Sequence, residues 1–306
     1  MKKVLFVPLL ALLATSCGRA EPEIDLVAYE QEVMDWRAGR LERLLAPNGF
    51  LTQVGLYWLE EGAFSIGSDS GNDIVLPATA AAWVGQIQVT GEEIRLLVND
   101  GVEVFSDDQA ISEITLPPDT SGEYVTVSHG SIAWSAIERG GKLAIRVRDY
   151  EHPWVKSFGP LPYYDIDPKW RVNATFHGYD EPRVITVNTV IEGFDQNPIS
   201  PGTVTFEVGG VEYELEAQAS GDSLFFVFGD ATDRDDTYGA GRFLYTATPD
   251  ENGKLILDFN KSYSPPCAFN DFSTCPVASP RNRLPIRIEA GEKFDPDLHY
   301  SGVAAR

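Results

Sequence analysis

The 306-residue sequence is poor in the residue types that most often carry catalysis, metal binding or contacts to polyanions. It has 3 cysteines and 4 histidines, and its 24 Lys and Arg are outnumbered by 46 Asp and Glu, which gives a formal net charge of −22. Because so acidic a surface repels nucleic acid, we expect no nucleic-acid partner. The cysteines and histidines form no CxxC or HxxxH pair, so we expect no metal centre.

The sequence also lacks the short fingerprints of common enzyme classes. It contains no GxSxG, HExxH, P-loop or dinucleotide-binding pattern, so we expect no cofactor and leave open whether the protein is an enzyme. Four acidic residues resemble a calcium loop in composition, but the glycine and glutamate that an EF-hand requires at its sixth and twelfth positions are missing. We interpret these residues as a solvated turn, with weak calcium binding as the alternative: Asp230, Asp233, Asp235 and Asp236.

The N-terminus has the features of an export leader, predicted over residues 1–16. Lys2 and Lys3 precede an apolar run of about ten residues, which is too short to span a bilayer as a helix. The run ends in Leu-Ala-Thr-Ser before Cys17, which resembles a bacterial lipobox, so Cys17 is predicted to carry acyl chains such as palmitate. An ordinary secretory leader cut near the same place is the alternative.

A lipidated Cys17 would make the membrane a partner of this chain. Residues 17–25 read as a tether between the lipid and the folded part. Gly18, rather than Asp, follows the cysteine, which favours transfer to the outer membrane in a host that sorts lipoproteins in the usual Gram-negative way. The expected location is the cell envelope, on the outer membrane facing the periplasm.

Residues 26–46 are predicted to form one amphipathic helix. Apolar residues fall at positions 26, 29, 33, 36, 41, 44 and 45, close to the helical period of 3.6. Asp25 is a plausible N-cap, and Pro47-Asn48-Gly49 ends the pattern. We expect the apolar stripe to pack on the β-domain that follows, with a partner-binding helix as the alternative.

Residues 50–148 alternate between strand and turn signals and resemble a forkhead-associated β-sandwich. Such domains hold phosphothreonine through an Arg that follows a Gly and through a Ser-Arg-x-His string further along the chain. Here Ser68 follows Gly67, and Thr79-Ala80-Ala81-Ala82-Trp83 stands in place of the string. A phosphate pocket needs fixed donors and positive charge, so we expect the sandwich without phosphopeptide binding.

Residues 149–168 are read as a connection and residues 169–306 as a second β-domain that contains the Cys loop. The predicted fold class is therefore all-β, or mainly β, with one N-terminal amphipathic helix and a β-sandwich followed by a second sandwich or barrel-like domain. The strands expected in this second domain are 170–177, 184–191, 203–208, 211–218, 224–228, 242–248, 254–259 and 284–290.

The stretch from Phe225 to Glu292 gathers the polar residues most suited to a site. In the functional interpretation Arg242 or Arg283 would hold an anion, and Asp258 or Glu292 would serve as a general base. The alternative is a buried polar network that pins the Cys loop to the sheet, because buried charges must be paired. The candidate cluster comprises Tyr238, Arg242, Asp258, Asn260, Asn282, Arg283 and Glu292.

Cys267 and Cys275 are expected to form a disulfide, because the chain is predicted to be exported. Closing so short a loop would stabilise the fold by about 2.5 kcal/mol in the chain-entropy description. A reactive Cys267 thiolate is the alternative, and it would need a nearby His or cation to lower its pKa.

Three strings in this region, TYGAGRFL, LDFNKSYSPPCAFNDFSTCP and NRLPIRIEAGEK, resemble the family catalogued as domain of unknown function 1684. GLYWLEEGAFSIGSDSGNDIVLP and IRVRD resemble it earlier in the chain. The resemblance implies a fold and a region of interest but no reaction, and Ser264 stands where the family's string has Asn. We expect an exported lipoprotein that binds a small molecule or an envelope ligand; the alternatives are a hydrolase-like enzyme centred on Arg242, Asp258 and Glu292, and a hydrophobic-ligand carrier.

Overall fold

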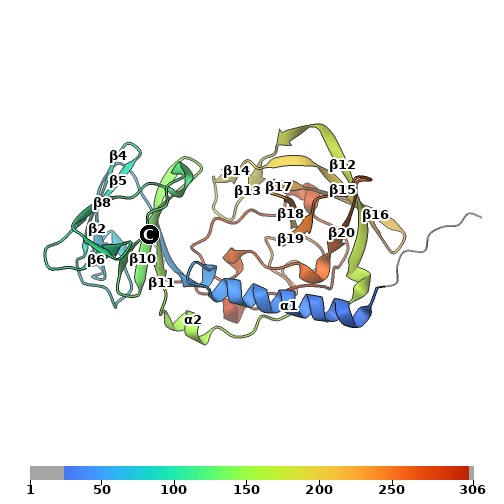
Figure 1. Ribbon diagram of the computed structural model, residues 1–306, viewed down its shortest axis with the longest axis horizontal. Helices are drawn as coiled ribbons and strands as arrows, with labels where there is room; N and C mark the ends of the chain where they lie inside the picture. Colours follow the sequence, from blue (N-terminus) through green and yellow to red (C-terminus); the bar gives the residue numbers. More distant parts are fainter. Residues whose placement is uncertain (1–23, 303–306) are drawn as a thin grey trace, which may run out of the picture.

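The computed structural model describes residues 24–302, and within them the fold is mainly β with one long helix at the N-terminus (Figure 1). The predicted leader, Cys17, Gly18 and the tether up to residue 23 lie outside the described residues. No helix in the described part of the chain is long and apolar enough to cross a bilayer.

The long helix α1 (Leu26–Leu45) confirms the predicted helix. The Asp25 side chain caps it by accepting hydrogen bonds from the backbone N–H groups of Val27 and Ala28, both at 3.1 Å. The helix ends at Leu45, because its C-cap Ala46 directly precedes Pro47 and proline restricts the residue before it to extended conformations.

The chain then builds a β-sandwich, called the sandwich below. A six-stranded sheet has the order β1-β11-β10-β9-β6-β7 and a five-stranded sheet the order β3-β2-β4-β5-β8, antiparallel except for β2 and β3. Aliphatic side chains from both sheets and Trp134 fill the space between them. Its strands are β1 (Gln53–Trp58), β2 (Gly62–Gly67), β3 (Ile74–Val75), β4 (Gly85–Thr90), β5 (Glu93–Val98), β6 (Val104–Ser106), β7 (Gln109–Ile111), β8 (Glu113–Thr115), β9 (Val127–His129), β10 (Ile132–Arg139) and β11 (Lys142–Asp149).

The remaining strands form the C-terminal domain. A four-stranded sheet, β16-β15-β12-β20, faces a three-stranded sheet, β17-β18-β19, and a two-stranded sheet pairs β13 with β14. Phenylalanine rings fill the core between the sheets, with Phe206 and Phe228 against Phe259 at centroid distances of 5.5 and 5.3 Å. The strands are β12 (Arg171–Val184), β13 (Val187–Asn188), β14 (Asp195–Gln196), β15 (Ile199–Val208), β16 (Val211–Glu216), β17 (Gln218–Ser220), β18 (Ser223–Phe228), β19 (Arg242–Ala247) and β20 (Lys254–Asp258).

Short helices occupy the connections. The segment between the two β-domains carries α2 (Pro153–Ser157), and the other short helices are 3-10 turns. They are η1 (Phe50–Thr52), η2 (Asp119–Ser121), η3 (Pro168–Trp170), η4 (Phe259–Lys261), η5 (Pro266–Ala268), η6 (Pro280–Asn282) and η7 (Pro296–Leu298).

The sequence predicts that α1 packs on the sandwich that follows it, and this prediction is wrong. It lies along the C-terminal domain (Figure 1), where its buried residues Tyr29 and Arg40 contact Asp258 and Glu292. The helical period of the apolar residues predicts one buried stripe along α1, but Leu26 and Leu45, which belong to this stripe, remain exposed. The helix is therefore the first element of the described residues but a structural part of the C-terminal domain.

Some strands predicted in the C-terminal domain are wrong, and the strand expected at 184–191 is reduced to the end of β12 and the two residues of β13. Residues 284–290 alternate like a strand but form no strand, because the carbonyls of Ile288 and Ala290 accept hydrogen bonds from the Arg242 side chain instead of a neighbouring strand. The strand predicted at 254–259 ends at Asp258, because the Asp258 side chain caps η4 through the backbone N–H of Asn260.

Candidate functional site

The polar residues predicted as one cluster lie in separate places, each with its own partners. Asp258 accepts a 2.8 Å hydrogen bond from the Tyr29 hydroxyl, and Asn260 donates to the same hydroxyl at 2.8 Å. Burial, reinforced by the Asp258 carboxylate, raises the pKa of Tyr29 far above its usual value. The Tyr29 hydroxyl therefore stays protonated, and its hydrogen bonds to Asp258 and Asn260 hold the N-terminal half of α1 on the C-terminal domain.

Glu292 forms the second anchor of the helix. Its carboxylate is fully buried, 3.3 Å from Arg40 Nε and 3.1 Å from the backbone N of Ser264. Arg40 also donates to the carbonyl oxygen of Ser264 at 2.9 Å. Burial raises the pKa of Glu292, and the Arg40 charge only partly offsets it. Because Ser264 takes part through its backbone, the missing family Asn leaves this contact intact.

Asp258 and Glu292 contact different turns of α1 and share no hydrogen-bond partner among the described residues. Their partners Tyr29 and Arg40 are eleven residues apart on α1, which corresponds to about 16 Å along a helix axis. A general acid and base must each reach the same reacting group within hydrogen-bond distance, and these two carboxylates are also buried.

Arg242 is a fully buried structural cation. Its Nη2 lies 2.5 Å from Asp230 and 3.0 Å from the carbonyl oxygen of Ile288, and its Nη1 donates to Ala290. The guanidinium also lies 5.2 Å from the ring centre of Phe228. Arg242 therefore has no free face for a ligand and instead joins β19 to the irregular C-terminal segment.

The other members of the predicted cluster also hold the loops together. Asn282 accepts from the backbone N of Glu216 at 2.8 Å and donates to the carbonyl of Val227 at 3.0 Å. Tyr238 packs against Phe294, with 5.3 Å between ring centres. The Asn282 contacts tie the long loop to β16 of the four-stranded sheet and to β18 of the three-stranded sheet.

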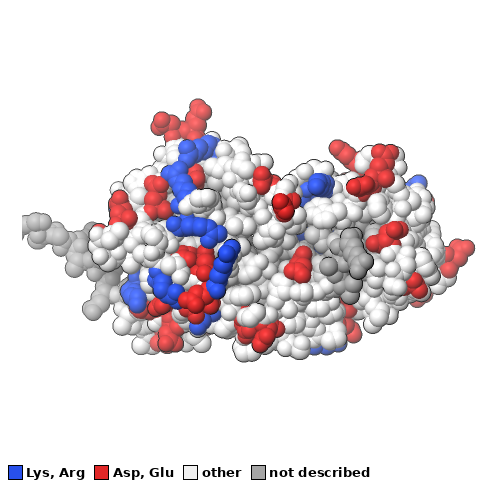
Figure 2. All heavy atoms as spheres, turned by 180° about the vertical axis from the view of Figure 1, so that it is seen from behind, with Lys and Arg blue, Asp and Glu red and all other residues white. Residues whose placement is uncertain are grey.

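Arginines also pair with the acidic turn that resembled a calcium loop. Arg283 lies 2.7 Å from Asp233, and Arg287 lies 2.8 and 2.7 Å from Asp235 and Asp236. In the view from behind, Figure 2 shows Lys and Arg side chains gathered over the C-terminal domain among Asp and Glu. Within residues 24–302, no group of three or more His, Cys, Asp or Glu side chains is arranged to hold a metal ion.

Cys267 and Cys275 are joined in a disulfide, as predicted, and both are buried. They pack with Val227, Phe243 and Ala278 in a small apolar cluster beside the three-stranded sheet. In this state neither sulfur is a thiolate, so the alternative of a nucleophilic Cys267 does not apply to the disulfide-bonded protein.

A cleft of about 540 Å³ lies between α1 and the three-stranded sheet, and we call it the aromatic cleft. Its volume is in the range of small-molecule sites. Helix α1 and the loop after it form one wall, and β18, β19 and residues 261–266 form the other. The lining residues are Trp36, Arg40, Arg43, Ala46, Asn48, Gly49, Phe50, Phe225, Phe243, Tyr245, Lys261, Tyr263 and Pro266.

Aromatic rings line the cleft in contact with one another. Phe225 stacks on Tyr245 with 4.6 Å between centroids, and Trp36 lies 6.0 Å from Tyr263. Tyr245 is 48% exposed and Phe225 is partly exposed, although both stand on strands. A flat apolar molecule could therefore cover rings that water now contacts.

One of the three cations of the cleft is unpaired. Arg40 is engaged by Glu292, and Lys261 forms ion pairs with Glu32 and, at 3.6 Å, with Asp258. Arg43 is exposed and forms no ion pair with any carboxylate of residues 24–302. The cleft thus combines an apolar floor with one free positive charge at its rim.

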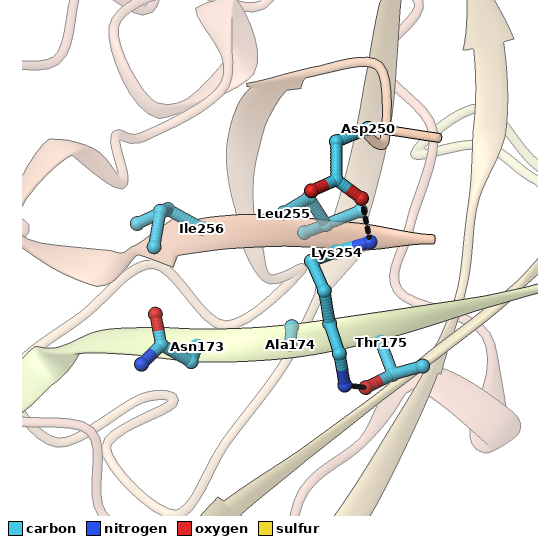
Figure 3. A pocket seen from close by; sticks show the side chains of 7 residues that line it. All are labelled: Asn173, Ala174, Thr175, Asp250, Lys254, Leu255 and Ile256. Carbon is cyan, nitrogen blue, oxygen red and sulfur yellow. Dashed lines mark hydrogen bonds between the residues drawn. The ribbon is translucent and has the colours of Figure 1, made fainter. Parts of the chain in front are cut away.

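A second hollow, of about 360 Å³, lies on the outer face of β12 and β20 (Figure 3). Its polar groups already bond to one another: Lys254 Nζ donates to Thr175 Oγ1 at 2.8 Å, and its backbone N donates to Asp250 at 2.7 Å. Because these side chains satisfy each other at the surface, this hollow is a weaker candidate than the aromatic cleft.

Sequence reasoning missed most of the cleft. Trp36 was recognised only as part of the apolar stripe, and Arg43, Phe225 and Tyr245 were not singled out. The available signal was a set of aromatic residues on strands predicted at 224–228 and 242–248, but alternation does not reveal which face remains uncovered.

The described part of the chain is a mainly β protein with a long C-terminal loop that a disulfide closes. The chain belongs to the family described as "Protein of unknown function (DUF1684)", which matches residues 156–293. The chain is also similar to an uncharacterized protein of Haloarcula marismortui, solved by solution NMR, with 32% identity over 46% of this chain and 79% of that one and a TM-score of 0.39. No curated protein matches the chain.

Proposed function

We propose that this chain is an exported lipoprotein, anchored in the cell envelope through Cys17, whose folded part binds a small amphipathic anion in the aromatic cleft. The ligand class is a molecule with a flat apolar body and one carboxylate or similar anionic group. The observation that carries this proposal is the unpaired Arg43, which lines the same cleft as the exposed ring of Tyr245 and the partly exposed ring of Phe225.

The chemistry of the cleft favours this class over a neutral or a cationic ligand. Trp36 and Tyr245 offer ring faces for apolar contact. The Arg43 guanidinium offers charge-assisted hydrogen bonds to a carboxylate, which are stronger than bonds between neutral groups. The protein's net charge of −22 would repel an anion elsewhere on the surface, so local positive charge is needed for binding.

The two alternative functions have less support. A hydrolase centred on Arg242, Asp258 and Glu292 would need them in one open pocket, whereas they are buried with separate partners. A carrier that holds its ligand inside the C-terminal domain would need an interior cavity, whereas Phe206, Phe228 and Phe259 fill the core between the sheets.

Calorimetric titration of the mature chain in a phosphate-free neutral detergent tests the binding proposal. The probes are 2-naphthoate and the neutral 2-naphthamide, which share one ring system and differ in charge. We expect naphthoate to bind at least about tenfold more tightly, because a hydrogen bond to a charged group contributes about 1.5 kcal/mol or more. Arg43→Gln should remove this preference.

Arg95→Gln is the matched control, because it removes the same charge from β5 of the sandwich. Equal affinity for the two probes, or a naphthoate preference that Arg43→Gln leaves unchanged, would contradict the proposed ligand class. The lipid anchor is tested separately by metabolic labelling with palmitate, which we expect in the wild-type chain and not in Cys17→Ser. An unlabelled wild-type chain would refute the anchor without affecting the cleft.

A further inference from the structure

A smaller hollow of about 120 Å³ lies on the outer face of the six-stranded sheet of the sandwich, where β10 and β11 pair. Two arginines, Arg146 and Arg148, line it together with Tyr124, Tyr150 and Ser135. Asn48 lines both this hollow and the aromatic cleft, but none of these five residues lines the cleft. The hollow thus adjoins the cleft at Asn48 and has its own set of charged and hydroxyl side chains on the sandwich.

Strand alternation explains why the two arginines share this face. On β11, Ile145 and Val147 point into the sandwich core, so Arg146 and Arg148 point outward. Their direct neighbours on β10 are the small residues Ser135 and Ala133. The Cα atoms of Arg146 and Arg148 are about 7 Å apart along the strand. Because the side chains opposite them are small, a hollow remains between these two long side chains.

Arg146 has no carboxylate in direct contact with its guanidinium. Its Nε is buried and has no hydrogen-bond partner, and no carboxylate of residues 24–302 forms an ion pair with it. The nearby carboxylate of Asp119 is already held by Arg139 through two bonds of 2.8 and 2.7 Å. Arg148 donates to the carbonyl of Gly49 and to Thr52, which fixes it in place.

The electrostatics of the hollow are therefore unbalanced toward positive charge. Burial, and then the charges of Arg139 and Arg148, lower the pKa of Arg146 to about 10, although the Asp119 carboxylate acts in the opposite direction. A buried cation that faces like charges raises the free energy of the folded protein. An anion placed between the guanidinium groups would remove this penalty, since Arg is suited to oxyanions through its planar set of donors.

We propose that this hollow is a binding site for a small oxyanion, a phosphate or a phosphate monoester. Arg146 would be the principal ligand, Arg148 the second cation, and the hydroxyls of Tyr124 and Tyr150 neutral donors at the rim. The site lies on strands of the sheet and not at Ser68 or residues 79–83, where the resemblance to forkhead-associated domains places phosphothreonine recognition.

The test compares the mature wild-type chain with Arg146→Gln and with Lys142→Gln, in phosphate-free detergent and buffer. Lys142 is a matched control, because it is an exposed cation on the same strand, four residues before Arg146. Inorganic phosphate is titrated by calorimetry, and thermal melts are recorded with and without saturating phosphate. A ligand that binds only the folded state raises the midpoint of the melt.

We expect phosphate to raise the melting midpoint of the wild type and of Lys142→Gln but not of Arg146→Gln, and we expect Arg146→Gln to weaken phosphate binding at least tenfold. Without phosphate, Arg146→Gln should melt no lower than the wild type, because it relieves like-charge repulsion. A purely structural role for Arg146 would instead lower the phosphate-free midpoint, which would overturn the proposal, as would equal phosphate effects in all three proteins or none in the wild type.

A second titration with glycerol 1-phosphate distinguishes the source of the oxyanion. At least tenfold tighter binding than inorganic phosphate would support the site and assign it to a phosphate monoester such as a lipid headgroup. Binding equal to or weaker than that of inorganic phosphate would support the site as one for the free ion. Failure of this site would leave naphthoate binding at the aromatic cleft unaffected, because none of the residues varied here lines the cleft.

Discussion

Arg40 and Glu292 are 252 positions apart in the sequence, yet Arg40 Nε lies 3.3 Å from Glu292 Oε2 and the two side chains are only 7% and 0% exposed. Arg40 also lies over the ring of Tyr263, 4.4 Å from its centre. The pair joins α1 to the end of the C-terminal domain, so the stability of the whole domain depends on an arginine near the start of the chain.

Arg40→Met is expected to lower the free energy of unfolding by about 3–5 kcal/mol, because it leaves the buried Glu292 carboxylate without its cation. Urea denaturation measures the loss. The double variant Arg40→Met/Glu292→Leu should lose less than the sum of the two single variants, since no uncompensated charge remains. Arg95→Met, from an ion pair with exposed side chains, should change stability by no more than about 1 kcal/mol; strictly additive losses at 40 and 292 would refute the pairing.

Arg242→Ala should destabilise the fold without changing naphthoate affinity. It removes the partner of the buried Asp230 and the donors to the carbonyls of Ile288 and Ala290, and we expect a clear fall in the thermal midpoint. Arg283→Ala is the comparison, because Arg283 is half-exposed in its pair with Asp233 and its loss should be small. An unchanged midpoint for Arg242→Ala would show that the arginine is not part of a structural network.

Asp233 should make the protein less stable as the pH rises. Burial, and then the neighbouring Asp230 charge, raise the pKa of Asp233 to about 6, although Arg283 pulls it down. Between its ordinary pKa of about 4 and 6, the unfolded chain holds fewer protons at this position than the folded one, so stability falls with rising pH in that window. Asp233→Asn should therefore gain stability over the wild type from pH 4 to 6 and keep a constant gain above. A difference that is independent of pH, in urea titrations across this range, would contradict the raised pKa.

The thiol content reports on both cysteine predictions. The sequence holds three cysteines; with Cys267 and Cys275 bridged and Cys17 in a thioether to lipid, the unfolded mature chain should show no free thiol before reduction and two after. Cys267→Ser and Cys275→Ser should destabilise equally, by about 2.5 kcal/mol. One thiol before reduction and three after would refute lipidation, and two or more before reduction would refute the bridge.

The sequence allowed good prediction where local signals decide the structure. The helix at 26–45 has its period, its cap at Asp25 and its stop at Pro47, and these are properties of neighbouring residues. The strands of the sandwich follow from alternation in the same way. The structure confirms a β-sandwich in this region. The more specific resemblance to forkhead-associated domains stays a prediction.

Prediction from the sequence failed where contacts between distant segments of the chain determine the local structure. Leu284, Ile286, Ile288 and Ala290 alternate like a strand, but the donors that satisfy this segment come from the side chain of Arg242. The stripe of α1 indicates a buried face without indicating what covers it. The aromatic cleft needs α1, the loop after it and strands about 200 residues later, so its rings could be identified as strand residues but not as a site.

The docking of α1 has a consequence for how this chain can be divided. The segment that matches the family, 156–293, ends just after Glu292 and begins well after Tyr29 and Arg40. A fragment cut at these limits would keep the carboxylates of Asp258 and Glu292 and lose the two side chains that bury them. During synthesis, α1 emerges before Asp258 and Glu292, so its contacts with them can form only after the whole sandwich and most of the C-terminal domain have been made. The unit of sequence similarity is thus shorter than the unit that folds.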